Sequence, residues 1–198
     1  MRTLVIDTAT RALSVALFEG DTLLAHHHEL VGRGHAERLV LAIAGLAEGG
    51  RAKRIAVGCG PGSFTGTRVA IAAARALAFA WDAGLEGFDT LALIEADARR
   101  QGAEGEVAVV AEGGHGEWLC RFEGEPGAAM APAIANFHVP HGAVCGDRGA
   151  DLLALRGDAT APLPGEADAR AWPWIGVTDR WAEVAPRYAR APDAGLPG

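Results

Sequence analysis

Residues 58–68 read Gly-Cys-Gly-Pro-Gly-Ser-Phe-Thr-Gly-Thr-Arg, and they join an apolar strand-like run at 55–57 to an alanine-rich helical run at 69–81. Glycine permits tight turns, and Ser63 and Thr65 can cap the helix that follows. A helix that begins in this way directs unpaired N–H groups at whatever lies above it, so the loop can hold an anion. The alternative is a well-capped turn without a ligand.

Two better-known loop templates do not fit this stretch. A P-loop needs a lysine before its final serine or threonine, and the only lysine of the chain is Lys53. A nucleophile elbow needs glycine two residues before and after its serine, whereas Ser63 has Pro61 and Thr65 there. The loop therefore indicates a strand–turn–helix unit of an α/β protein without specifying a reaction.

The overall composition indicates a globular protein. The chain has 198 residues, 49% of them hydrophobic, and a net charge of -7, which disfavours direct binding to a nucleic acid backbone. No apolar run approaches the ~20 residues of a membrane span, and the strand-like start after Met1 lacks a leader pattern. The three cysteines have no metal-binding spacing and are expected to be buried thiols. We expect a cytoplasmic protein.

The sequence repeats itself in outline. Residues 3–21 read as strand, turn and strand, and residues 107–125 do the same. The run 57–60 has a weaker counterpart at 144–147, again followed by a helical stretch. The pattern predicts a duplicated α/β unit; the alternative is chance similarity between short apolar strands.

The periodicity predicts a mixed sheet with helices packed on it in each half. We expect a first lobe at 1–97, a smaller second lobe at 98–190 and a loose tail at 191–198, with the lobes meeting between Leu85 and Gly105. The expected strands are 2–7, 12–19, 22–30, 54–59, 106–112, 116–123 and 142–146, and the expected helices are 35–48, 66–82, 90–101, 148–155 and 177–184.

Two of the expected helices are too apolar for ordinary surface helices. In 35–48, Leu39, Ile43 and Leu46 form one stripe, and further apolar residues cover much of the remainder. In 66–82, the stretch from Val69 to Trp81 is apolar except for Arg75. A helix that is apolar nearly all round needs cover on more than one side. Either a partner protein supplies the second cover, or the helices pack on each other and on the second lobe.

Few residues suggest catalysis. Asp7 ends a strand and is followed by Thr8 and Thr10, a set that could hold a hydrated magnesium ion or a phosphate, or simply cap the turn; Glu112 occupies the matching place in the second half. The histidines at 26–28 alternate faces in a strand, so an exposed strand edge explains them better than a metal site. The sequence has no pair of histidines four residues apart.

Several strings closely resemble the bacterial TsaB (YeaZ) family, whose members are partners in making the threonylcarbamoyl modification of adenosine in tRNA. The resemblance is strong from residue 2 to about 100 and weaker to 190. The strings that carry it are Ile6-Asp7-Thr8-Ala9-Thr10, Ser14-Val15-Ala16-Leu17 and Gly60-Pro61-Gly62-Ser63-Phe64-Thr65-Gly66-Thr67-Arg68, supported by His35, Asp89-Thr90-Leu91 and Pro186-Arg187-Tyr188-Ala189-Arg190.

The resemblance implies an actin-like fold of the sugar kinase and Hsp70 type, with two related lobes. It implies a non-catalytic subunit that supports the transferase TsaD together with the ATPase TsaE, contacts tRNA only through the complex, and forms a homodimer when alone. The two apolar helices would form the interface in either assembly. On this basis the expected interface residues are Leu39, Ile43, Leu46, Arg68, Ala72, Arg75 and Phe79.

The resemblance also leaves room for ATP or ADP with magnesium at the interface shared with TsaD. The residues expected to face an anion or nucleotide are Asp7, Thr8, Thr10, Gly60, Gly62, Ser63 and Thr65. The second half departs from the family pattern, because the stretch 112–118 lacks the arginine that the family usually has there. This departure weakens the expectation of an anion contact in the second lobe.

Three functions follow from these observations. The first is a scaffold that binds TsaD. The second is an actin-like enzyme that hydrolyses ATP or transfers its phosphate, with Asp7 holding a metal and residues 60–65 forming a phosphate cradle. The third, a peptidase, lacks a recognisable Ser–His or His-metal pattern.

Overall fold

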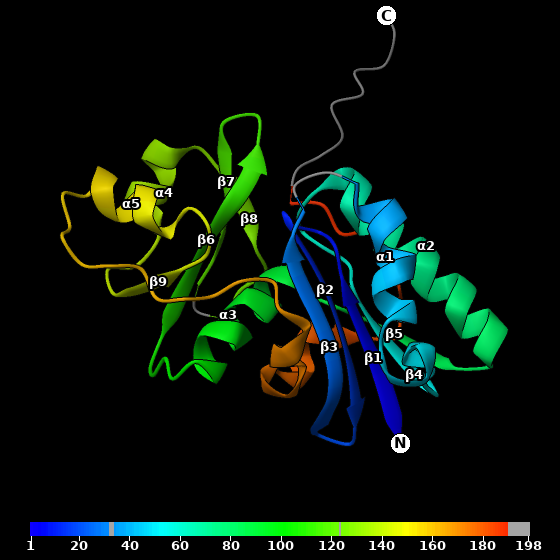
Figure 1. Cartoon of the computed structure of the whole chain (residues 1–198). Coiled ribbons are helices and arrows are strands. Elements are labelled where there is room, and N and C mark those ends of the chain that lie inside the picture. The colour runs from blue at the N-terminus through cyan, green and yellow to red at the C-terminus, as the bar shows by residue number, and fades with distance from the viewer. Residues whose placement is uncertain (32–33, 123, 190–198) are drawn as a thin grey trace, which may run out of the picture.

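The computed structural model describes residues 1–31, 34–122 and 124–189. It has two lobes, each built on one sheet (Figure 1). The first sheet has the order β10-β5-β4-β1-β2-β3, with β1 (Arg2–Asp7), β2 (Ala12–Glu19), β3 (Thr22–Leu30), β4 (Arg54–Gly58), β5 (Gly84–Phe88) and β10 (Arg180–Trp181). The second has the order β8-β7-β6-β9, with β6 (Val107–Gly114), β7 (Glu117–Arg121), β8 (Ala128–Met130) and β9 (Ala143–Cys145).

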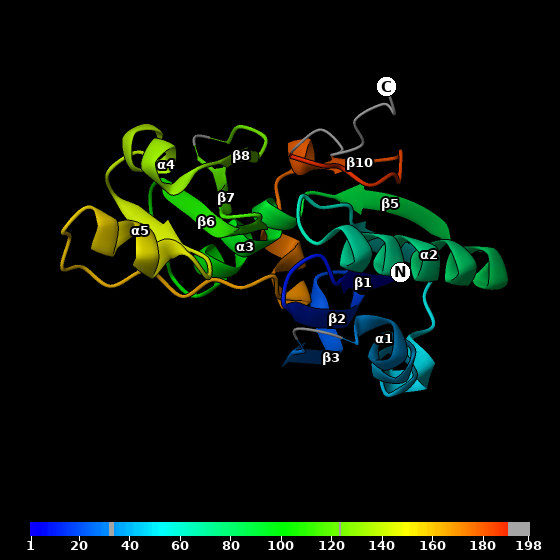
Figure 2. The same ribbon diagram turned by 90° about the horizontal axis from the view of Figure 1, so that it is seen from above.

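Helices cover both faces of the first sheet (Figure 2). Helices α1 and α2 lie on one face, α3 and η2 lie on the other, and α4 and α5 lie on the outer face of the second sheet. The bounds are α1 (His35–Ala44), α2 (Phe64–Trp81), α3 (Thr90–Arg100), α4 (Pro132–His138) and α5 (Gly149–Leu155), with short 3-10 helices η1 (Ala47–Gly50), η2 (Ala169–Trp174) and η3 (Val177–Asp179).

The two sheets share one topology, which confirms the predicted α/β fold of two related lobes. In the first sheet, β1 pairs antiparallel with β2 and parallel with β4. In the second, β6 pairs antiparallel with β7 and parallel with β9. Asp7 and Glu112 occupy matching places, each paired with a residue of the partner strand close to the turn of its hairpin.

The hydrophobic core explains why the strands are apolar on both faces. Along β1, Leu4 and Ile6 pack toward α1 and α2, whereas Val5 packs toward α3 and η2. Helix α3 belongs to a cluster that also contains Val109 and Leu119 of the second sheet. The lobes therefore meet across α3, which is buried between the two sheets.

Some predicted elements differ from the structure. The expected helix at 177–184 is wrong: η3 and β10 occupy that stretch, and β10 adds to the first sheet by pairing with β5. The helix expected at 35–48 ends at Ala44, because Leu46 already adopts an extended backbone conformation before the short helix η1. Elements β5, β8, α4 and η2 were not predicted, since all four are short, and β5 and η2 also contain glycine or proline.

The expected lobe boundary after residue 97 lies inside α3, and β10 returns the chain to the first sheet. We keep it as a proposal for where the lobes divide, while the tail expected at 191–198 lies outside the described residues. The three cysteines, Cys59, Cys120 and Cys145, are buried free thiols, as predicted. Within the described ranges, no helix has the length and apolar character needed to span a membrane.

Candidate functional site

The glycine-rich loop joins β4 to α2 and is fastened to the turn between β1 and β2. Ser63 caps α2, as predicted: its Oγ accepts a hydrogen bond from the N–H of Gly66 at 3.1 Å. The N–H of Ser63 donates to the carbonyl of Ala9 at 2.6 Å. The hydroxyl of Thr8 donates to the carbonyl of Gly66 at 2.7 Å. These bonds hold the loop and the turn together as one unit.

Two glycines of the loop are required by this close packing. A Cβ atom at Gly62 would lie 2.1 Å from the carbonyl oxygen of Ala9, and one at Gly66 would lie 2.0 Å from that of Thr8. Only glycine allows two backbone segments to approach this closely. The packing supports the capped-turn alternative for these positions rather than an open anion cradle.

Gly60 serves a different contact. Its φ of 90° lies in the left-handed region that favours glycine, and a Cβ there would lie 2.6 Å from the carbonyl oxygen of Arg187. Its own carbonyl accepts the N–H of Thr90 at 2.9 Å. Gly60 therefore joins the loop to the start of α3 and to the C-terminal segment.

Asp7 lies beneath the loop and is completely buried. Its Oδ1 accepts the N–H of Ala9 at 2.9 Å, and its Oδ2 accepts the hydroxyl of Thr90 at 2.8 Å. A Cβ at Gly58 would lie 1.9 Å from that Oδ2, so glycine is needed beside the carboxylate. Both oxygens of Asp7 are enclosed in the core and already accept hydrogen bonds, so the metal-holding interpretation stays a prediction without support from this geometry. The turn-capping alternative describes the structure.

Burial raises the pKa of the Asp7 carboxyl to about 6, and the hydrogen bonds from Ala9 and Thr90 partly oppose that rise. The desolvation of the charged carboxylate therefore affects the pKa more than the two hydrogen bonds do. The Asp7 carboxyl thus holds the turn and the start of α3 together through hydrogen bonds, while burial disfavours its charged form.

A cavity of about 1110 Å³ lies between the lobes. Of the residues predicted to face an anion, Thr10, Gly62 and Ser63 line it, whereas Asp7, Thr8, Gly60 and Thr65 do not. The hydroxyl of Thr10 accepts the N–H of Ala12 at 3.1 Å, so it also caps the turn. The structure thus brings only part of the predicted set to one surface.

Two arginines of the cavity are paired with carboxylates of the chain itself. Arg11 lies 3.1 Å from Glu166 and 3.8 Å from Asp147, which connects the first lobe to the second. Arg148 pairs with Glu112 and, at 2.8 Å, with Asp151. These guanidinium groups are neutralised internally, so an anionic ligand would have to displace existing partners.

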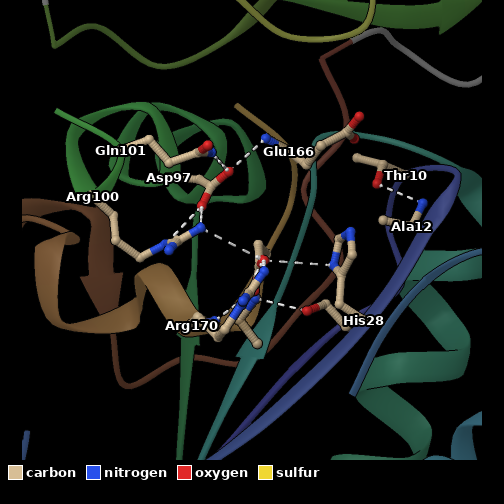
Figure 3. Close-up of polar contacts among 11 residues, drawn as sticks. Thr10, Ala12, His28, Asp97, Arg100, Gln101, Glu166 and Arg170 are labelled. Carbon is tan, nitrogen blue, oxygen red and sulfur yellow. Dashed lines mark hydrogen bonds and ion pairs between the residues drawn. The ribbon is translucent and has the colours of Figure 1, made fainter. Parts of the chain in front are cut away.

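Behind the cavity, a polar network joins α3 to the segment that returns from the second lobe (Figure 3). The buried Asp97 accepts a hydrogen bond from Arg100 at 2.7 Å and from the N–H of Glu166 at 3.0 Å. Asp168 accepts from Arg170 at 2.6 Å and lies 3.9 Å from Arg100. The network fixes the returning segment against the first lobe.

The three consecutive histidines lie on β3, the edge strand of the first sheet, as expected. His27 lies 3.2 Å from Glu29, and His28 lies 3.9 Å from Asp168, so the two rings have different partners. Across residues 1–31, 34–122 and 124–189, no three histidine, cysteine or carboxylate side chains gather as a metal site would require.

The outer surface of α1 and α2 is apolar and open to solvent. On α1, Val40 and Leu41 are 64% and 72% exposed. On α2, Phe64 and Phe79 are 61% and 92% exposed, and Ala72 lies on the same face. Exposed apolar side chains concentrated on adjacent helices are typical of an interaction surface. We call this surface the α1/α2 face.

The structure corrects part of the predicted interface. Leu39, Ile43 and Leu46 are buried in the core beneath α1, where they pack with Leu13 and Val57 of the first sheet. The sequence showed a stripe but not which stripe faces the sheet. The predicted residues of α2 are exposed as a partner surface requires, and they are Arg68, Ala72, Arg75 and Phe79.

An aromatic cluster at the start of α2 was not singled out by the sequence interpretation. The rings of Phe64 and Tyr188 stack with centroids 5.6 Å apart. The Cζ of Arg68 lies 3.2 Å from the centroid of the Phe64 ring and 5.4 Å from that of Tyr188. All three residues line the mouth of the cavity and adjoin the α1/α2 face. The sequence contained one indication of this cluster: Phe64, Arg68 and Tyr188 all lie in strings that resemble the TsaB family.

Comparison with known proteins agrees with this geometry. A family model described as TsaD, tRNA N6-adenosine threonylcarbamoyltransferase, matches residues 27–144, which is more than half of the chain. The chain is 39% identical over 116 residues to the tRNA threonylcarbamoyladenosine biosynthesis protein TsaB of Escherichia coli, covering 56% of this chain and 50% of that protein. The chain belongs to the TsaB (YeaZ) family.

Other relatives align over different shares of their length. The TsaB protein of Bacillus subtilis is 30% identical, with 50% of this chain and 45% of that protein covered. An uncharacterized protein of Mycobacterium tuberculosis is 30% identical over 96% of this chain and 92% of its own length. The matched region thus spans half or less of each TsaB protein named here, but nearly all of the mycobacterial one.

Solved structures of TsaB-type proteins have the same fold. YeaZ from Pseudomonas aeruginosa superposes with a TM-score of 0.69 and 28% identity, covering 88% of this chain and 89% of that one. A second structure, described as an uncharacterized protein with similarity to peptidase YeaZ from Pseudomonas aeruginosa, gives a TM-score of 0.72 at 26% identity, covering 96% of this chain and 99% of that one. The actin-like two-lobe architecture expected for the family is therefore present in this chain.

Proposed function

We propose that this chain is a non-catalytic subunit for threonylcarbamoyl modification of adenosine in tRNA, acting in the cytoplasm. It binds a TsaD-type transferase and, with it, a TsaE-type ATPase, and it meets tRNA only through that complex. The relatives named for this pathway support the assignment to the pathway. The exposed α1/α2 face supports the role of a partner subunit.

The α1/α2 face is the observation that carries the proposal. Val40, Leu41 and Phe79 are large apolar residues that the chain itself leaves exposed. Transferring such side chains from water into an interface is favourable by about 25 cal/mol for each Å² of apolar surface buried. The same face serves a homodimer when the transferase is absent, so the two assemblies compete for it.

Light scattering on the purified chain, alone and mixed with a TsaD-type transferase, tests this function. We expect a homodimer that gives way to a mixed complex. Phe79→Asp and Leu41→Asp should abolish both assemblies and leave a folded monomer with an unchanged circular dichroism spectrum, because both side chains are exposed. Phe137→Asp is the matched control, since Phe137 is 82% exposed on α4 of the other lobe. If the complex forms with Phe79→Asp but not with Phe137→Asp, the interface lies on the second lobe and the proposal is contradicted.

Nucleotide binding in the cavity between the lobes is a second candidate. Its volume of about 1110 Å³ and its position between the lobes favour it. Thr10 and Ser63 would contact the ligand, with ATP or ADP and magnesium contributed to the interface with TsaD. A calorimetric titration with Mg-ATP tests it: heat that disappears in a Ser63→Trp variant would support binding there. Absence of heat in the chain and in its complex would remove the idea.

A peptidase role has no supporting geometry. The sequence has two serines, Ser14 and Ser63. Ser14 is buried and accepts the N–H of Ala169 at 2.8 Å, and Ser63 caps α2. Both hydroxyls are therefore explained by structural hydrogen bonds, and a protease assay with a denatured protein should show no cleavage.

A further inference from the structure

The exposed side of α2 carries positive charge only. Between Phe64 and Trp81 the charged residues are Arg68 and Arg75, and both are exposed. They lie on the same side as Ala72 and Phe79, at intervals of three or four residues that place them along one helical stripe. The stripe is thus apolar with two arginines, in a chain whose net charge is -7.

Neither arginine has a carboxylate partner among the described residues. The guanidinium of Arg68 lies over the ring of Phe64 at 3.2 Å. Arg75 donates from Nη2 to the carbonyl of Val184 at 2.6 Å. Arg38 of α1 contrasts with them, because it pairs with Glu29 at 2.8 Å. The chain leaves these two charges available to a partner.

The spacing of the two arginines sets the geometry of that partner. Seven residues correspond to about 10 Å along a helix axis, or roughly two turns. Ala72 lies between them and Ala76 follows Arg75, and both small side chains are exposed, which lets a second helix approach closely. A complementary helix would place carboxylates about two turns apart on either side of an apolar contact.

A second copy of this chain presents the wrong charges. An antiparallel two-fold contact centred on Ala72 brings Arg68 of one copy within about one turn of Arg75 of the other. Like charges facing each other across an interface oppose association, and salt screens the repulsion. Pairing of α2 with a carboxylate-bearing partner has the opposite dependence on salt.

We propose that Arg68 and Arg75 select the partner of the α1/α2 face: they favour a protein whose facing helix carries carboxylates, and they weaken pairing with a second copy. The inference rests on the proposed function, because it assigns the specificity of that docking surface. Apolar residues supply attraction to either partner, and the two arginines decide between them.

Sedimentation equilibrium and calorimetry on the double variant Arg68→Gln/Arg75→Gln test the proposal, at low and high salt. We expect the homodimer to tighten by roughly tenfold and the complex with the TsaD-type transferase to weaken by roughly tenfold. In the unmodified chain, added salt should tighten the homodimer and weaken the complex with the transferase. Both salt effects should be smaller in the double variant. Arg68→Lys/Arg75→Lys retains the charges and should behave like the unmodified chain.

Arg99→Gln is the matched control, because Arg99 is a partly exposed arginine on α3, away from this face. It should change neither assembly. If the complex forms normally with the double Gln variant, the inference is overturned while the proposed function stands. If Phe79→Asp leaves every assembly intact, the proposed function fails and the inference fails with it. Unequal circular dichroism spectra would identify a folding effect, and the Lys variant then decides between charge and structure.

Discussion

The position of Asp7 in the structure differs most from what its neighbours in the sequence suggest. A strand-terminal aspartate beside threonines is typical of a metal or phosphate site, yet here it is enclosed by Gly58, Ala9 and Thr90. It connects the β1–β2 turn to the start of α3. Its two hydrogen bonds therefore join segments that lie far apart in the sequence.

The raised pKa of Asp7 predicts a specific dependence of stability on pH. Because the folded-state pKa of about 6 lies above the unfolded value near 3.8, the folded state binds the proton more tightly. The contribution is fully present below about pH 4 and is lost as the pH rises through 6. The difference corresponds to about 3 kcal/mol of unfolding free energy.

Asp7→Asn removes this titration while keeping an acceptor for the N–H of Ala9. Denaturant unfolding from pH 4 to pH 7 should therefore show a smaller loss of stability in the variant than in the unmodified chain. Identical pH profiles for the two proteins would contradict the assignment of the raised pKa to Asp7.

At the scale of elements, α1 shows how a helix with two apolar sides divides its roles. Leu39 and Leu41 are two residues apart, so they point to different sides of the helix. Leu39 is 1% exposed and packs in the core, whereas Leu41 is exposed on the α1/α2 face. One side stabilises the lobe, and the other remains available to a partner.

We expect Leu39→Ala to lower the unfolding free energy by about 3 kcal/mol, because it removes buried methyl groups and leaves a cavity. Leu41→Ala should change it by less than about 0.5 kcal/mol, since the side chain is exposed. Urea denaturation of both variants at low protein concentration measures the difference. Equal destabilisation would mean that α1 is rotated relative to the structure.

At the scale of the whole molecule, α3 and its neighbours join the lobes. Arg121 of β7 is 4% exposed; it donates to Glu95 of α3 at 3.1 Å and to Asp179 of η3 at 3.0 Å. Asp179 precedes β10 of the first sheet. A buried arginine of the second lobe is thus compensated by carboxylates next to the first.

Arg121→Met should therefore destabilise the chain by about 3 kcal/mol, because it removes a buried guanidinium from two partly buried carboxylates, of which Glu95 keeps Arg99 as a second partner. Arg148→Met is the control: its ion pairs are exposed, so the cost should be about 1 kcal/mol or less. Because the lobes share a core across α3, calorimetry should show a single transition in the unmodified chain. Two separate transitions would contradict a shared core.

The sequence by itself determined the duplicated α/β fold, the strand–loop–helix unit at 54–81, the capping role of Ser63 and the reduced cysteines. Each of these depends on residues close together in the chain, whose periodicity or turn chemistry is visible locally. The brief elements β5, β8 and η2 were missed because so few residues give no periodic signal, and β5 and η2 also contain glycine or proline.

Only the tertiary structure decided which side of α1 is buried, that Asp7 faces the core, and that the glycines accommodate Thr8 and Ala9. These outcomes depend on contacts between segments more than fifty residues apart, such as the hydrogen bonds from Ser63 to Ala9 and from Thr90 to Asp7. The sequence shows that a residue is apolar, but whether it is buried depends on the element that packs against it. The distribution of exposed apolar and charged groups on α2 is for that reason a property of the folded chain.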